Sequence, residues 1–177
     1  MFWKKKNPKI TFKCSQCGQI HNTWPALGYG EPWHYSQLTP QQQKDIAKID
    51  EDFCEIHWEE QTDRFIRTTL TIPVNNFELN LEYGLWVSLS EKSYNDYSDQ
   101  YERTDYESGY FGWVCNQLLG YEDILSVPTD VNTQLGTRRP ILDLHKDYDH
   151  QLVTDFVNGI TKEEAERRIH EMMKNVG

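Results

Sequence analysis

The protein has 177 residues and a net charge of −10 at pH 7, because 28 acidic residues outnumber 18 lysines and arginines. A chain of this length can bury a core as a single domain, and such an excess of negative charge repels duplex nucleic acid. The sequence has no apolar stretch close to the ~18 residues of a membrane span, so we predict neither a nucleic-acid nor a membrane partner.

Basic residues cluster only at the start of the sequence, where Lys4, Lys5, Lys6 and Lys9 lie close together. We expect residues 1–9 to form a flexible basic end, because chain termini are commonly solvated. This end lacks the apolar region of a secretory signal peptide, so the sequence predicts a cytoplasmic protein.

The first half of the chain alternates turn-forming and strand-forming segments. Residues 10–13 predict a short strand, and residues 22–38 predict a loop because they contain two prolines and two glycines. Thr39 followed by Pro40 predicts the start of a helix that runs to residue 49. β-branched and aromatic residues predict three further strands, over residues 53–58, 64–74 and 81–89.

The second half begins with a helix from the N-cap Ser90 to about residue 103, followed by an apolar segment over residues 111–116. Two strands, over residues 127–135 and 140–145, are predicted on either side of a turn at Gly136.

The C-terminal end is predicted to be helical. Asp149 is the predicted N-cap of a short helix to Val157, which Gly159 ends. Thr161 and Glu164 form a predicted capping box for the last helix.

Strands that follow one another in sequence, with helices mainly near the ends, favour the α+β class. We therefore predict a single domain over residues 1–177, with a mainly antiparallel sheet, flanking helices and an N-terminal Cys-x-x-Cys zinc knuckle.

The zinc knuckle is predicted from Cys14 and Cys17, which are followed directly by Gly18. Two thiolates at this spacing on a tight turn can hold one zinc ion, and a tetrahedral site needs two more ligands. We expect His21 to be the third ligand and Cys54 the fourth. A site with four protein ligands is closed, so this zinc would be structural.

Three alternatives to this ligand set stay open. His57 is the reserve ligand, although on an extended strand it points to the opposite face from Cys54. The thiols could also carry no metal. A thioredoxin-like redox pair is the third alternative, but the motif does not lie between a strand and a helix of a βαβ unit.

An ordered series of motifs resembles the bacterial proteins grouped as domain of unknown function 2199. The matching segments span residues 12–160: Cys14-x-x-Cys17-Gly18-x-x-His21, Cys54-x-Ile56, Phe65-Ile66-Arg67, Ile72-Pro73-Val74, Gly84 to Glu91, Tyr110 to Asn116, Gly120-Tyr121, Arg139-Pro140 and Asp149-His150. The resemblance places His21 and Cys54 on motif positions, and His57 and His145 outside them. It implies no established activity.

A tyrosine face is predicted on the helix after Ser90, where Tyr94, Tyr97 and Tyr101 recur at helical spacing among acidic residues. Together with Trp113 these side chains could bind another protein, because tyrosine and tryptophan bury large areas while their polar atoms stay satisfied. The same tyrosines could equally pack on the sheet.

A cluster of acids and histidines follows near the C-terminus, including Asp143, His145, Asp149 and His150. Such groups can hold a metal or act as a general base, which gives the alternative of a metal-assisted hydrolase using the His145/His150 region. The favoured interpretation is a solvent-facing strand edge followed by a helix cap, because no nucleophile motif accompanies the cluster.

We therefore predict a non-catalytic, zinc-knuckle-bearing domain that binds another protein and assign no catalytic residue. Its most specific version is a toxin-neutralising immunity protein, an expectation that rests on analogy with other small acidic bacterial proteins.

Overall fold

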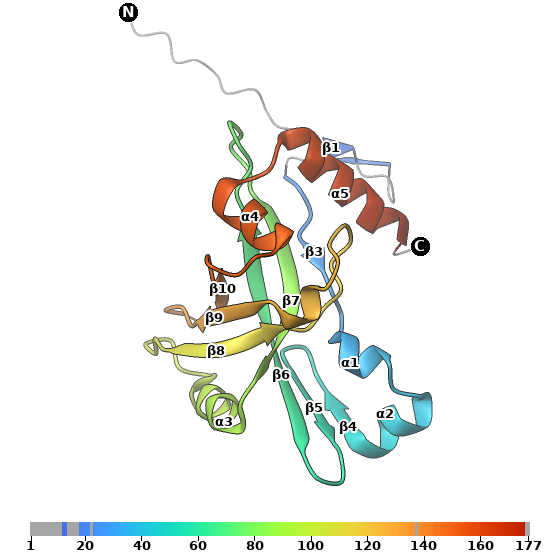
Figure 1. Ribbon diagram of the computed structural model, residues 1–177, viewed down its shortest axis with the longest axis vertical. Helices are drawn as coiled ribbons and strands as arrows, with labels where there is room; N and C mark the ends of the chain where they lie inside the picture. Colours follow the sequence, from blue (N-terminus) through green and yellow to red (C-terminus); the bar gives the residue numbers. More distant parts are fainter. Residues whose placement is uncertain (1–11, 14–17, 22, 137, 176–177) are drawn as a thin grey trace, which may run out of the picture.

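The computed structural model describes residues 12–13, 18–21, 23–136 and 138–175. Its longest strands are β6 (Thr62–Ile72) and β7 (Leu81–Leu89), which form an antiparallel hairpin (Figure 1). Alternate residues of β7 beginning at Leu81 are buried, as the period of an extended strand requires when one face covers a core. The hairpin is the scaffold on which the other strands assemble.

The hairpin continues into a closed barrel of five strands. The three further strands are β8 (Gly109–Val114), β9 (Pro128–Asn132) and β10 (Ile141–Leu144). Each pairs antiparallel with its predecessor, so the first and the fifth strand run in the same direction. The barrel therefore closes through a parallel contact, with Ile141 beside Thr69. The α+β class and the mainly antiparallel pairing are confirmed, but the sheet is a closed barrel, which was not predicted, because β10 returns to β6.

Three short strands extend the sheet beyond the barrel: β3 (Leu27–Gly28), β4 (Ala47–Ile49) and β5 (Phe53–His57). The long strands make this extension possible, because each has room for two partners along one edge. One edge of β6 pairs with β5 and then with β10. One edge of β7 pairs with β3 and then with β8.

The described residues form five α-helices next to the sheet: α1 (Trp33–Ser36), α2 (Pro40–Ile46), α3 (Glu91–Gln100), α4 (Gln151–Asn158) and α5 (Lys162–Asn175). The predicted caps Thr39 and Ser90 are confirmed, since both side chains accept backbone hydrogen bonds. The helix from Pro40 is shorter than predicted, because residues 47–49 form β4. No described helix is long and apolar enough to cross a membrane.

A separate two-stranded sheet lies near the N-terminus. β1 (Phe12–Lys13) pairs antiparallel with β2 (Ile20–His21), so His21 lies opposite Phe12. Cys14 and Cys17 fall between these strands, outside the described residues. In Figure 1, β1 lies beside α5, at the opposite end of the molecule from β4 and β5.

The apolar interior has two parts. The larger fills the barrel and continues beneath α3, α4 and α5. The smaller lies on the outer side of the β6–β7 hairpin, under the segment that contains α1 and α2, and its members are Leu38, Cys54, Ile56, Phe65, Trp86 and Cys115. The loop predicted over residues 22–38 is thus a structured cover that includes β3 and α1.

Asn116 joins this cover to β7. Trp86 lies between the part of β7 that pairs with β3 and the part that pairs with β8, and its backbone N–H donates to Asn116 Oδ1 at 2.7 Å. Asn116 Nδ2 donates to the carbonyl oxygen of Glu31 at 2.8 Å. Asn116 is 2% exposed, so water does not replace these bonds.

Replacement of Asn116 by alanine should lower the free energy of unfolding by about 1–3 kcal/mol, because the Trp86 N–H and the Glu31 carbonyl lose their buried partner. Urea unfolding measures the change. Asn95→Ala on the exposed face of α3 is the matched control and should change stability little. Equal stability of the two variants would contradict this role of Asn116.

Candidate functional site

A groove of about 650 Å³ lies on the outer side of the β6–β7 hairpin, between α1 and the end of β8. We call it the tryptophan groove. Its lining residues are His34, Gln61, Thr62, Asp63, Arg64, Phe65, Ser88, Leu89, Trp113, Cys115 and Leu125.

Three exposed tryptophans contact or line this groove. Trp113 lines it and is 43% exposed. Trp58 is 40% exposed, and its indole N–H donates to the lining carboxylate of Asp63. Trp33 is 37% exposed and packs edge-on against the lining ring of His34. Large apolar side chains at one concave surface are typical of a binding site, whereas scattered ones are not.

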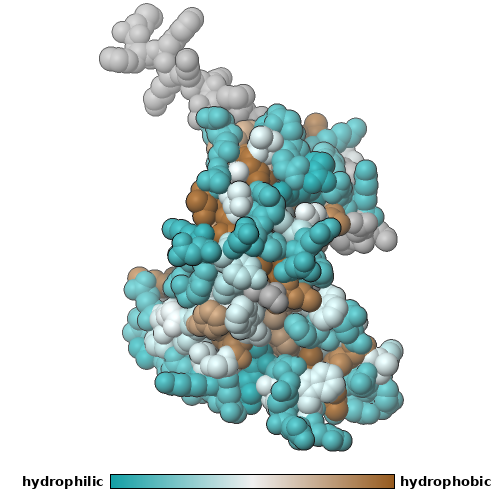
Figure 2. All heavy atoms as spheres, in the orientation of Figure 1, coloured by the Kyte–Doolittle hydropathy of each residue, from teal (hydrophilic) through white to brown (hydrophobic). Residues whose placement is uncertain are grey.

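Backbone contacts fix the two walls relative to one another. The backbone N–H of Trp33, the first residue of α1, donates to the carbonyl of Cys115 at 2.7 Å. On β8 the odd-numbered residues face outward, so Trp113 and Phe111 share the outer surface and pack edge to face. Figure 2 shows apolar side chains over β8 within a mostly hydrophilic face.

The floor of the groove is chemically inert. Burial raises the pKa of the Cys115 thiol to about 12, so it stays protonated at neutral pH. A thiol is a poor nucleophile until it loses its proton. The Cys115 Sγ donates instead to the carbonyl oxygen of Trp113, at 3.3 Å. This floor can support a ligand, but it offers no activated nucleophile.

His34 is neutral in the groove wall. Burial lowers its pKa, while the nearby Asp63 carboxylate acts in the opposite direction. Its Nδ1 atom is buried and has no hydrogen-bond partner among the described residues. Its ring stacks on Phe65, with centroids 5.4 Å apart.

The lining of the groove carries one acid, Asp63, and one base, Arg64, and the charged residues next to them are mainly acidic. Arg64 is held by Glu91 at 2.8 Å and by Glu55 at 3.6 Å. The turn before β6 adds Glu59 and Glu60. Together with Asp63, these acids outnumber the one arginine.

The predicted tyrosine face divides between core and surface. Tyr94 and Tyr97 are 8% and 6% exposed and pack around Phe53. They are core residues because α3 lies over the sheet. This agrees with the alternative in which the tyrosines pack on the sheet. Tyr101 remains partly exposed, but its hydroxyl donates to Asp52 at 2.7 Å. Of the four predicted protein-binding residues, Trp113 alone lines the groove.

The structure does not bring Cys54 to the predicted zinc knuckle. Cys54 lies on β5, at the other end of the molecule from β1 (Figure 1), and is 1% exposed. Burial raises the pKa of its thiol to about 12. No group of three metal-ligating side chains occurs within the described parts of the chain, and Cys14 and Cys17 lie outside them.

His150 serves as a helix cap. Its Nδ1 accepts from the Leu152 backbone N–H at 3.0 Å, and its Nε2 lies 2.6 Å from the Glu122 carbonyl. Since a carbonyl only accepts, Nε2 carries the hydrogen and both ring nitrogens are occupied. The helix cap is therefore His150, one residue after the predicted cap Asp149. His145 contacts Asp130 at 3.2 Å, and Asp143 faces solvent as expected.

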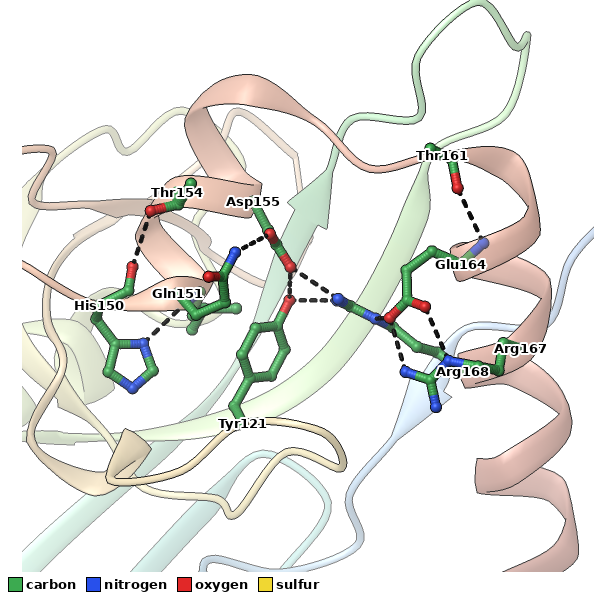
Figure 3. A network of polar contacts seen from close by, with 10 residues as sticks. Tyr121, His150, Gln151, Thr154, Asp155, Thr161, Glu164, Arg167 and Arg168 are labelled. Atoms are coloured by element: carbon green, nitrogen blue, oxygen red, sulfur yellow. Dashed lines mark hydrogen bonds and ion pairs between the residues drawn. The ribbon is translucent and has the colours of Figure 1, made fainter.

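A buried polar network fastens α4 and α5 to the barrel. Asp155 accepts from the Tyr121 hydroxyl at 2.6 Å and from Arg168 at 2.7 Å (Figure 3). Arg168 also donates to the Tyr121 oxygen and to Glu164. The charges in this network are paired with one another, so it holds the helices in place.

Sequence reasoning missed Trp33, His34, Trp58 and Asp63 as members of one site. One signal in the sequence could have indicated an exposed aromatic residue: Trp58 lies in a polar segment, between His57 and two glutamates. Their convergence depends on the fold.

Comparison with known proteins gives one match. The sequence profile of the family described as "Uncharacterized protein conserved in bacteria (DUF2199)" matches residues 13–160, which confirms the resemblance found in the motifs. Searches of curated proteins and of solved structures return no match.

The stability of the protein should fall as the pH is lowered below 7. The pKa of His34 is lower in the folded state than its ordinary value of 6.5, so the unfolded chain takes up a proton first. The contribution of neutral His34 to the free energy of unfolding is present above pH 6.5. It is lost as the pH falls through the pKa that His34 has in the folded state. Urea unfolding between pH 7.5 and 5 measures it. His34→Phe keeps a ring on Phe65 and should reduce the pH dependence, whereas an unchanged dependence would contradict the assignment.

Proposed function

The chain belongs to this family of bacterial proteins, and we propose that it is a non-catalytic protein-binding domain whose partner docks at the tryptophan groove. The observation that supports the proposal is a set of three partly exposed tryptophans: Trp113 lines the groove, and Trp58 and Trp33 contact its lining residues Asp63 and His34. Tryptophan is enriched among the residues that dominate protein–protein affinity, because its large ring buries much area at one point.

A protein partner fits the site better than a reacting small molecule. Phe65 and Cys115 on its floor belong to the smaller core cluster, so the groove is a fixed surface. The Cys115 thiol is protonated, and burial lowers the pKa of His34, whose Nδ1 has no hydrogen-bond partner in the described part of the chain. The fixed apolar floor supports binding, and the protonated thiol supplies no nucleophile.

The partner is a basic protein. The chain carries a net charge of −10, and acids predominate around the groove. Opposite charge on a partner would accelerate association and select against acidic competitors. Neutralisation of a basic toxin, as an immunity protein, is the most specific form of this proposal and rests on analogy.

The alternative of a metal-assisted hydrolase at His145 and His150 lacks support from their contacts. Both nitrogens of His150 are engaged in capping α4. A general base needs a free nitrogen within reach of its substrate.

We also propose that Cys14, Cys17 and His21 supply three of the four ligands of a structural zinc ion, with the fourth ligand unassigned. The pairing of β1 with β2 supports this, because it returns His21 to the strand that precedes Cys14. Cys54 does not fit the site, since it is a buried core residue on a distant strand. A cytoplasmic location is proposed with it, and the free, buried thiols of Cys54 and Cys115 suit a reducing compartment.

Replacement of Trp113 by alanine should weaken binding of the partner by about 30-fold or more, the loss typical of a hot-spot residue. The protein immobilised through its C-terminus would capture the partner from the bacterial lysate, and calorimetry with the purified partner would give the affinity. Tyr148→Ala removes a partly exposed ring outside the groove and serves as the control. Equal affinity of both variants would refute the groove as the docking site.

Replacement of Cys14 by serine should remove zinc and lower the melting temperature, because metal binding contributes to folding. Elemental analysis of the purified protein measures the zinc. Cys54→Ala should keep the full zinc content while losing stability through its core cavity. Loss of zinc from the Cys54 variant, or unchanged zinc and melting in the Cys14 variant, would contradict the proposed ligands.

A further inference from the structure

We infer that the tryptophan groove receives an arginine side chain of the partner, with Asp63 as the carboxylate that binds its guanidinium group. The inference rests on the proposed function and names the chemistry recognised at the same site. It is drawn from the hydrogen bonds of Asp63, the charges next to it and the rings around it.

Asp63 is held in a fixed orientation. Its Oδ2 accepts from the Trp58 indole N–H at 2.7 Å, and its Oδ1 accepts from Gln61 Nε2 at 3.0 Å. One donor on each oxygen orients the carboxylate and leaves acceptor capacity on both. Two oxygens with free capacity match the paired N–H groups of a guanidinium.

The negative charge of Asp63 has no cationic partner among the residues that the structure describes. Its neighbour Arg64 points its guanidinium to Glu91 at 2.8 Å and to the Thr62 carbonyl at 3.1 Å, with Glu55 close by. His34 is neutral because burial lowers its pKa. A cation from outside would therefore find an oriented and uncompensated carboxylate.

Aromatic side chains lie in the same groove as this carboxylate or next to it. Trp113 and Phe65 line the groove together with Asp63, and the Trp58 indole N–H donates a hydrogen bond to the Asp63 carboxylate. A guanidinium is planar and weakly hydrated, so it can stack on an indole and pair with a carboxylate at once. An ammonium group is a compact, strongly hydrated charge and gains less from such walls. The combination favours arginine over lysine.

The test is a titration of the full chain followed by NMR of the tryptophan indole N–H groups. The probes are N-acetylarginine methylamide, the matching lysine compound and the matching glutamate compound. Arginine should move the Trp58 and Trp113 signals with saturation, and lysine should bind at least about threefold more weakly. Asp63→Asn should remove the saturable response. Asp99→Asn, which removes one exposed charge from α3, should leave it unchanged.

Several outcomes would overturn the inference: no saturable shift with arginine, equal binding of lysine or glutamate, or full binding by the Asp63 variant. Affinity for the captured partner separates the two proposals. If Trp113→Ala weakens partner binding and Asp63→Asn does not, the docking site stands and the arginine inference fails. If neither variant changes partner affinity, both fail. Melting temperatures of the variants show that each remains folded.

Discussion

The hydrogen bonds of Asn116 determine where the covering segment lies on the barrel. Along one edge of β7, Trp86 lies between the residues that pair with β3 and those that pair with β8. No strand pairs with its backbone N–H there, and the side chain of Asn116 accepts this hydrogen bond instead. The same amide binds the Glu31 carbonyl, two residues before α1. The Cys115–Trp33 backbone bond then fixes the start of that helix. One wall of the groove therefore depends on this buried amide together with the Cys115–Trp33 bond and the pairing of β3 with β7.

Two kinds of charge arrangement serve different purposes in this molecule. Around Asp155 and Arg168 the charges are buried and paired, which costs desolvation but orients α4 and α5 uniquely against the barrel. At the groove the carboxylate of Asp63 is oriented by neutral donors, so its charge stays available. The first arrangement stabilises a structure, and the second supplies an interaction that a partner completes.

Local patterns predicted the elements that local forces determine. Strand β7 has its predicted bounds, and the caps Thr39 and Ser90 begin their helices, because alternation and capping act within a few residues. Barrel closure was missed, since it joins segments that are distant in sequence. Strand β3 was missed for the same reason: it exists through its contact with Tyr83 and Gly84. The groove likewise combines residues from five separated segments, and Trp113 is the one lining residue that was predicted.

Closure by the fifth strand also sets an order of events during folding. The β6–β7 hairpin needs only a short loop and can form early, whereas the parallel contact of Ile141 with Thr69 must wait until all intervening strands exist. Contacts of long sequence separation slow folding, because loop entropy is lost before they are gained. On the ribosome, the edge of β6 that receives β10 stays uncovered until the last strand emerges. Nascent chains are thus exposed to edge-to-edge association from the emergence of β6 until the emergence of β10.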